Sequence, residues 1–314
     1  MLESFLAALR VVFPMALLML LGAGARRAGV TDRPAMRSVD KLTFRIFMPV
    51  LLFKNIYETD LSQSFTPKEA VFASLALLLV IFPAALLLPP RLVKDRAQAA
   101  SIGQAMIRTN YILFGIAAAE SIFGEGNIGP VAILGAIVVP LTNALSVIVL
   151  EVGRSGRTKP GRLALSILKN PMVMATLAAL AAMALPFRIP ALLWDVVKNI
   201  AGVTTTISFI SLGVSLDLGQ FRANRRPLII GLVLRMVLIP LVFLPLSVAL
   251  GFREQSLCGL MVLFAAPTAV ASYPMAVAMG ADGPLAGQLV CAGTVLSVFT
   301  MFCYTFLFRS LGLL

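Results

Sequence analysis

The sequence contains no histidine among its 314 residues and only three cysteines. The absence of histidine excludes His–metal sites, Ser–His and Cys–His catalysis, and a histidine proton switch. Cys258, Cys291 and Cys303 match no metal-ligand spacing, and their odd number gives no disulfide framework. No cluster of Asp or Cys replaces the missing histidines. We therefore expect no metal, no other cofactor and no enzymatic activity.

Charge is also scarce. Charged residues make up 13% of the chain, against about 25% in a typical soluble domain, and the mean hydropathy is +0.96. Apolar residues form long runs, and residues 72–89, FASLALLLVIFPAALLLP, carry no charge. About 20 such residues cross the hydrocarbon core of a bilayer. The sequence therefore predicts an all-α integral membrane protein in the lipid bilayer.

The apolar runs predict ten transmembrane helices. The first is not typical of a signal peptide, because Arg26 and Arg27 follow its apolar part instead of preceding it. The predicted spans are residues 4–25, 38–57, 68–89, 98–122, 128–151, 168–187, 190–216, 226–250, 255–279 and 284–309.

The positive charges predict an orientation. The formal net charge is +12, and 16 of the 26 Lys and Arg residues lie in the loops after spans 1, 3, 5 and 7. The positive-inside rule places these loops in the cytoplasm, so both termini are expected on the non-cytoplasmic side of the cell (inner) membrane. No basic patch is interleaved with aromatic residues, so we expect no nucleic acid partner.

The two halves of the chain repeat one pattern. Span 1 contains Pro14-Met15 and span 6 contains Pro171-Met172; Gly129-Pro130 follows span 4 and Gly283-Pro284 follows span 9. A repeat of five spans enters the membrane from opposite sides in its two copies, which is typical of secondary transporters. We predict a first repeat at residues 1–151, a cytoplasmic linker at 152–167 and a second repeat at 168–314.

Inverted-repeat transporters bind substrate near the midplane, where discontinuous helices meet. Asn110 and Pro267 each lie 12 residues into spans 4 and 9, about 18 Å deep at about 1.5 Å per residue. Pro267 and Pro274, with Thr268 and Ser272 between them, predict an unwound stretch whose freed backbone groups bind ligand. The alternative is a simple proline kink without a ligand.

Three further polar residues are candidates for substrate contact. Arg108 lies beside Asn110 and could pair with a substrate carboxylate, or it could extend to the cytoplasmic interface. Asn143 in span 5 could contact substrate or pack between helices. Tyr57 closes span 2 and could be a contact or an interfacial aromatic residue.

Carboxylates are nearly absent from the middle of the spans. Asp40, Asp195, Asp217, Glu120 and Glu151 all fall near span ends. Since ion-coupled carriers usually place Asp or Glu in the membrane core, this absence favours transport driven by the substrate gradient and the membrane potential.

Four segments together resemble the auxin efflux carrier family, which includes plant auxin carriers and bacterial malonate or malate permease-like proteins. They are TNYILFGIAAAESIFG (109–124), VPLTNALSVIVLE (139–151), SLGVSLDL (211–218) and APTAVASYPMAVAMGADGP (266–284). The resemblance covers essentially the whole chain. It implies a bile-acid-symporter-like fold with spans 4 and 9 broken and crossing. It also implies a scaffold domain (spans 1, 2, 6 and 7), a transport domain (spans 3–5 and 8–10), an elevator mechanism and a homodimer.

The resemblance also points to site residues. Asn110, Gly115 and Ile116 match the family motif of span 4, in which Asn is followed by Gly-Ile-Pro, but Ala117 stands in place of that proline, so we expect a milder break. Pro267 matches the crossover proline of span 9, and Thr268 and Ser272 line the same stretch. Asn143 falls where the family places a polar side chain facing the substrate.

The sequence thus predicts a secondary transporter that moves a small organic anion, an auxin-like acid or a mono- or dicarboxylate, by alternating access. A Na⁺- or H⁺-coupled symporter or antiporter of the same fold is the alternative. A receptor or scaffold without transport gives no reason for matched breaks in both repeats.

Overall fold

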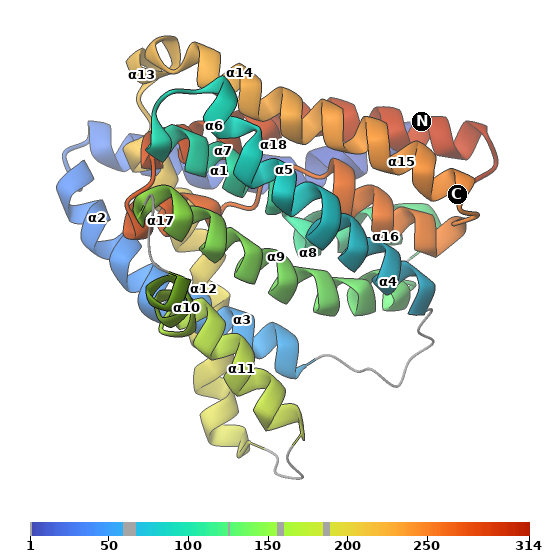
Figure 1. Ribbon diagram of the computed structural model, residues 1–314, viewed down its shortest axis with the longest axis horizontal. Coiled ribbons are helices and arrows are strands. Elements are labelled where there is room, and N and C mark those ends of the chain that lie inside the picture. Colours follow the sequence, from blue (N-terminus) through green and yellow to red (C-terminus); the bar gives the residue numbers. More distant parts are fainter. Residues whose placement is uncertain (1, 59–66, 125, 156–159, 185–188) are drawn as a thin grey trace.

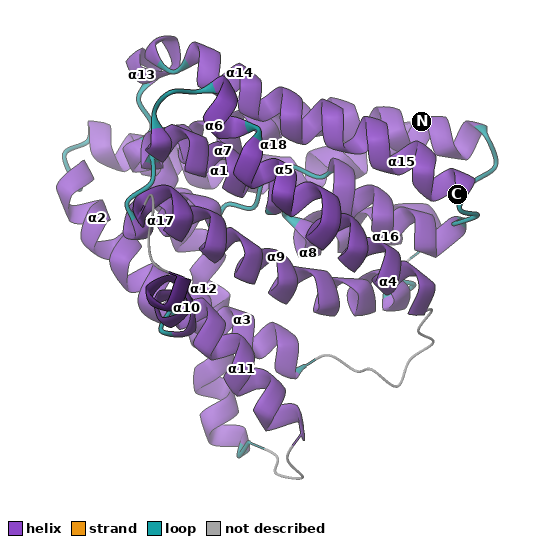
Figure 2. Ribbon diagram, in the orientation of Figure 1, coloured by secondary structure: helices purple, strands orange, loops and turns teal. Residues whose placement is uncertain are grey.

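The computed structural model describes residues 2–58, 67–124, 126–155, 160–184 and 189–314. Within these ranges the chain is helical and contains no β-strand (Figure 2). One isolated antiparallel bridge joins Thr109 to Thr268. The predicted all-α class is therefore confirmed.

The helices of the first half include two π-helical segments, η1 and η2. In chain order they are α1 (Leu2–Arg27), α2 (Arg33–Leu42), η1 (Thr43–Phe47), α3 (Met48–Tyr57), α4 (Pro67–Leu75), η2 (Ala76–Ile81), α5 (Phe82–Leu87), α6 (Pro89–Leu92), α7 (Arg96–Ile107), α8 (Tyr111–Phe123) and α9 (Gly129–Ser155).

The second half includes one more π-helical segment, η3. Its elements are α10 (Pro160–Leu168), α11 (Pro171–Ala184), α12 (Ala191–Ser215), α13 (Leu218–Ala223), α14 (Arg225–Val233), η3 (Leu234–Leu238), α15 (Ile239–Ala249), α16 (Glu254–Ala265), α17 (Ser272–Met279) and α18 (Gly283–Ser310).

Helices occupy all ten ranges predicted as spans. Among the described residues, six helices are long and apolar enough to cross a membrane; α8, α11 and α16 are shorter apolar helices. Most of the predicted linker is also helical, because α9 continues to Ser155 and α10 begins at Pro160. Its residues 156–159 lie outside the described part of the chain.

Each π-helical segment precedes a proline. Pro49, Pro83 and Pro240 each stand two residues after the end of η1, η2 and η3. Proline has no N–H and clashes with the carbonyl four residues earlier. The wider π turn places this carbonyl elsewhere, so a long membrane helix continues through the proline instead of ending there.

The helices pack as two groups that share α1 and α12. Helix α3 packs against α11 and α12, and these helices form the lower part of Figure 1. The upper part contains α14–η3–α15 and α18. Helices α7, α8, α9 and α16 lie in the middle of the picture, below α14–η3–α15. Helix α1 contacts α12, α8 and α18, so it connects the two groups.

Two glycines let α1 and α12 approach closely. A Cβ atom on Gly22 would lie 2.1 Å from the carbonyl oxygen of Ile210, and one on Gly213 would lie 2.0 Å from that of Met19. Small residues at helix crossings allow backbone contact inside a membrane, where the hydrophobic effect does not drive helix association.

We therefore expect Gly213→Ala to lower the melting temperature of the purified protein, because overpacking costs about 1–3 kcal/mol. Gly202→Ala is the matched control on the same helix, since nothing lies within 4 Å of a Cβ atom there. Alanine favours a helix over glycine by about 1 kcal/mol, so the control should keep or raise the melting temperature. Equal melting temperatures for the two variants would contradict the close contact.

Candidate functional site

Two helices are broken where they cross. Residues 108–110 separate α7 from α8, and residues 266–271 separate α16 from α17. The two extended segments lie antiparallel, with Thr109 opposite Thr268. The backbone N–H of Asn110 donates to the carbonyl of Pro267 at 2.8 Å. A short ladder of backbone contacts thus replaces part of the hydrogen bonding that both helices lose.

The two breaks also cap each other. The hydroxyl of Thr109 donates to the carbonyl of Val262 in the last turn of α16, and the hydroxyl of Thr268 donates to that of Ala105 in the last turn of α7, both at 3.4 Å. The Val262 carbonyl also accepts the N–H of Ala266, the C-cap residue of α16, whereas carbonyls of a final helical turn generally lack a partner within their own helix. Each broken segment therefore supplies a donor to the half-helix of the other.

Arg235 completes the capping from a third element. It lies on η3, is 2% exposed, and donates to the carbonyls of Met106, Leu263 and Ala266 at 2.6–3.3 Å. Its guanidinium therefore contacts the C-terminal ends of α7 and α16 together. These ends carry partial negative charge, which a buried cation stabilises. Arg235 joins the two half-helices at the centre of the crossover.

A cavity of about 240 Å³ lies beside the breaks. Arg108, Asn110 and the first turn of α8 form one wall, and residues of α3, α9, α11 and α12 form the others. The lining residues are Met48, Leu51, Leu52, Asn55, Arg108, Thr109, Asn110, Tyr111, Ile112, Leu113, Val139, Thr142, Asn143, Met172, Thr205, Ala269, Val270 and Ala271.

Arg108 is the cationic group of this cavity. Its side chain is buried, with 6% of the residue exposed, and Nη1 donates to the thioether sulfur of Met275 at 2.8 Å. A thioether is a weak acceptor. In the described part of the chain, no acidic side chain forms an ion pair with Arg108. Arg108, which lines the cavity, is thus a buried cation that has no carboxylate partner among the described residues and does not extend to the membrane surface.

Unpaired polar groups accompany this charge. Asn110 Nδ2 and Asn143 Oδ1 are buried without a hydrogen-bond partner, while Asn143 Nδ2 donates to the carbonyl of Val139 at 2.9 Å. Asn110 is also the N-cap residue of α8, but its side chain makes no capping bond. The N-terminus of α8 therefore directs its partial positive charge to the cavity. The cavity offers a cation, an amide donor and a helix N-terminus to an anion.

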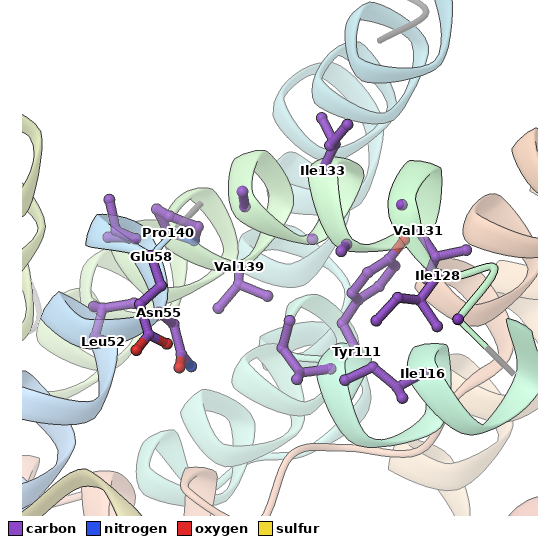
Figure 3. A pocket seen from close by; sticks show the side chains of 17 residues that line it. Leu52, Asn55, Glu58, Tyr111, Ile116, Ile128, Val131, Ile133, Val139 and Pro140 are labelled. Carbon is purple, nitrogen blue, oxygen red and sulfur yellow. The ribbon is translucent and has the colours of Figure 1, made fainter. Parts of the chain in front are cut away.

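A second cavity, of about 340 Å³, shares five lining residues with the first and is shown in Figure 3. The two share Leu52, Asn55, Tyr111, Ile112 and Val139. The second reaches Glu58 at the end of α3 and Gly126 before α9, which are both exposed. Figure 3 shows Asn55 and Glu58 on one side, with Tyr111 and Ile116 on the other. This cavity therefore extends from the residues that it shares with the first cavity to the exposed residues Glu58 and Gly126.

The predicted site residues occupy different places around the crossover. Arg108, Asn110 and Asn143 line the first cavity and Ile116 lines the second. Pro267 and Thr268 form the break itself. Ser272 begins α17, where its buried hydroxyl has no partner. Gly115 is buried, and a Cβ atom at this position would lie 2.9 Å from Cγ1 of Val131.

Two expectations about the breaks need correction. The break in span 4 falls at residues 108–110, and Ala117 lies within α8, seven residues after the break. Backbone pairing with the other broken segment, and not a proline, creates this break. In span 9 the break ends at Ala271, and Pro274 lies in the first turn of α17. Proline is tolerated there because that turn has no N–H bonded within the helix.

Tyr57 does not line either cavity. Its ring stacks on Phe53 and packs against Trp194, and its hydroxyl accepts a hydrogen bond from the N–H of Ile189 at 3.3 Å. The structure therefore places Tyr57 between α3 and α12 and not beside the other predicted residues.

Sequence reasoning missed the role of Arg235. The available signal was an arginine within an otherwise uncharged span, at residues 227–250. A charge at that depth requires partners inside the protein. The sequence did not show that the partners would be the ends of two broken helices.

The fold and the site together define a helical membrane protein with a cavity at two broken helices. The family model described as "Membrane transport protein" matches residues 7–305. The chain therefore belongs to this family of membrane transport proteins, the auxin efflux carrier family. No curated protein sequence matches the chain.

Replacing Arg235 should lower the stability of the protein more than replacing an exposed arginine does. We expect Arg235→Met to lower stability by about 3–5 kcal/mol, because carbonyls at the ends of α7 and α16 lose a charged donor. Arg45→Met is the matched control, since Arg45 also lies on a π-helical segment but is exposed. Thermal unfolding in detergent measures both; a similar small loss for the two variants would contradict the capping role.

Proposed function

We propose that this protein is a secondary transporter for a small organic anion, with the substrate held at the crossover. The observation that carries the proposal is Arg108, a buried cation that lines a cavity and has no carboxylate partner among the described residues. Burial of an unpaired charge is costly, and a substrate carboxylate would remove that cost. Asn110 Nδ2 and the N-terminus of α8 lie beside it as further donors.

The cavity supports a small substrate. Its 240 Å³ is below the 300–1,000 Å³ that is typical of sites for drug-sized ligands. Mono- and dicarboxylates such as malonate and malate, and auxin-like indole acids, are the proposed substrate class. Asn143 Oδ1 would accept a hydrogen bond from a substrate hydroxyl or N–H group.

An inverted repeat of ten spans is the architecture that we propose for this carrier. The capped carbonyls of Ala105 and Val262 support it, because each lies seven residues after the glutamine, Gln98 or Gln255, that begins its span. Equivalent groups in the two repeats thus receive equivalent bonds. Residues 1–151 and 168–314 form the two repeats, joined by residues 152–167.

The side on which the second cavity opens supports one particular state of an alternating-access cycle, the outward-open state. The second cavity reaches the exposed residues Glu58 and Gly126. The distribution of Lys and Arg in the sequence assigns this side to the non-cytoplasmic face. These observations support an outward-open state of the proposed carrier. Spans 1, 2, 6 and 7 would act as a scaffold while the remaining spans carry the site by an elevator movement, in a homodimer in the cell membrane.

Coupling to an ion is a second candidate, and one observation favours it. Asp40 of α2, which the sequence places near a span end, is buried and accepts a hydrogen bond from Ser211 of α12. Buried carboxyl groups in membrane proteins are typical of proton and cation pathways.

Uptake of labelled malonate, malate and indole acetate into proteoliposomes tests the proposed function. We expect Arg108→Gln to reduce uptake of the transported acid about 10- to 100-fold, the equivalent of one charged hydrogen bond. Arg91→Gln is the control, because Arg91 is an exposed arginine at the end of α6. Equal uptake by both variants would contradict the role of Arg108, and no uptake of any acid by the unaltered protein would contradict the transporter of organic anions.

A further inference from the structure

A second polar cluster lies apart from both cavities. At its centre is Asp40 of α2, which is 1% exposed. The hydroxyl of Ser211 on α12 donates to Asp40 Oδ1 at 2.6 Å. Asp40 Oδ2 is buried and has no hydrogen-bond partner. No basic side chain in the described ranges forms an ion pair with Asp40.

The cluster connects α2 and α12 to the second broken helix. Tyr273, in the first turn of α17, donates from its hydroxyl to Ser215 of α12 at 2.5 Å. The Tyr273 hydroxyl is also a neighbour of the Asp40 carboxyl. Tyr273 is buried and immediately follows Ser272 of the crossover. Because α12 and α17 pack on α2, a separation of α17 from α2 and α12 would uncover Asp40.

The charged groups on the elements packed against Asp40 leave it without a counter-ion. Arg33 pairs with Asp217 at 2.8 Å, and Asp195 pairs with Lys198 at 2.7 Å. Along α12, Asp195 and Lys198 lie about 24 Å and about 20 Å from Ser211. The remaining basic residues of α2 and η1 are exposed, and on α17 the single titratable group is Tyr273. These exposed residues are Arg37, Lys41 and Arg45.

Burial determines whether the Asp40 carboxyl is ionised or neutral. An ionised carboxylate without a cation is strongly disfavoured in a buried environment, whereas the neutral acid carries its proton on Oδ2. A hard metal cation usually takes at least six oxygen ligands. The cluster offers the Asp40 carboxyl and three hydroxyls that already bond within it. The proton is the ligand that this cluster fits.

We propose that Asp40, with Ser211, Ser215 and Tyr273, is a proton-binding site that couples closure of the cytoplasmic side to proton uptake. The proposal rests on the proposed function, which supplies the outward-open state. In that state a proton bonded to Oδ2 keeps the carboxyl neutral while α17 packs on α2 and α12. When α17 separates from them, water hydrates the carboxyl, the O–H bond breaks and the proton leaves to the cytoplasm.

Counterflow of labelled against unlabelled malonate, or whichever acid of the panel is carried, tests the coupling. With equal pH on both sides, we expect the rate in the unaltered protein to fall at least about tenfold between about pH 6 and pH 8.5, since a protonation equilibrium shifts tenfold per pH unit. Asp40→Asn is permanently neutral and should lose this dependence. Asp195→Asn, an exposed aspartate on α12, is the control and should keep it.

Thermal unfolding in detergent against pH gives a second readout that needs no substrate. Because the folded protein binds a proton that the unfolded chain releases, the melting temperature should fall as pH rises, and Asp40→Asn should reduce that slope. If Asp40→Asn does not fold, Ser211→Ala replaces it. Loss of the Ser211 donor disfavours the charged form, so the midpoint of the fall should move to higher pH.

The outcomes separate the two proposals. The proton site would be overturned if Asp40→Asn kept the pH dependence, or if Ser211→Ala left the midpoint unchanged. It would also be overturned if the rate of the unaltered protein depended on sodium and Asp40→Asn lost that sodium dependence. If no acid is carried by the unaltered protein, the proposed function fails, while the slope of melting temperature against pH still decides whether Asp40 binds a proton.

Discussion

A helix that breaks inside a membrane must find partners for the backbone groups that it frees, because no bulk water can supply them. The crossover of this protein depends on which groups bond to the freed backbone groups. Arg235 donates to carbonyls of both α7 and α16, and the hydroxyls of Thr109 and Thr268 donate across the crossing. The C-terminal ends of both half-helices are therefore satisfied by the protein, whereas the N-terminus of α8 is left facing the cavity. Capping one set of ends and leaving the other open supports the proposed anion site at the crossover.

The same crossover has different surroundings on its two sides. On one side the two cavities reach the exposed ends of α3 and α8, and on the other side α17 is packed against α2 and α12 around Asp40. A movement of α17 would therefore change both sides together. Helices α1 and α12 are in close backbone contact at Gly22 and Gly213. The π-helical turns before Pro49 and Pro240 keep the flanking helices continuous, so the breaks are confined to the crossover.

The sequence was sufficient for the features that composition and depth determine. Long uncharged runs predicted the helical ranges, and the equal depth of Asn110 and Pro267 predicted two breaks that meet, which the Asn110–Pro267 hydrogen bond confirms. The sequence was not sufficient where contacts with other helices determine a helix break or the burial of a residue. Ala117 led to an expected mild break because a proline was missing, yet pairing between the broken segments suffices to interrupt the helix. Asp40 lies near a span end in the sequence but is buried, because α12 and α17 cover it. Tyr57 carries no feature in the sequence that would show its packing on Trp194.

The most direct test of the crossover site is an experimental map of the protein in lipid nanodiscs at saturating concentration of the acid that it carries. The account predicts that the carboxylate of the acid lies within hydrogen-bonding distance, about 2.7–3.2 Å, of the Arg108 guanidinium and Asn110 Nδ2. It also predicts that Arg235 remains bonded to the ends of α7 and α16. An acid bound elsewhere, with Arg108 extended to the membrane surface, would contradict the account.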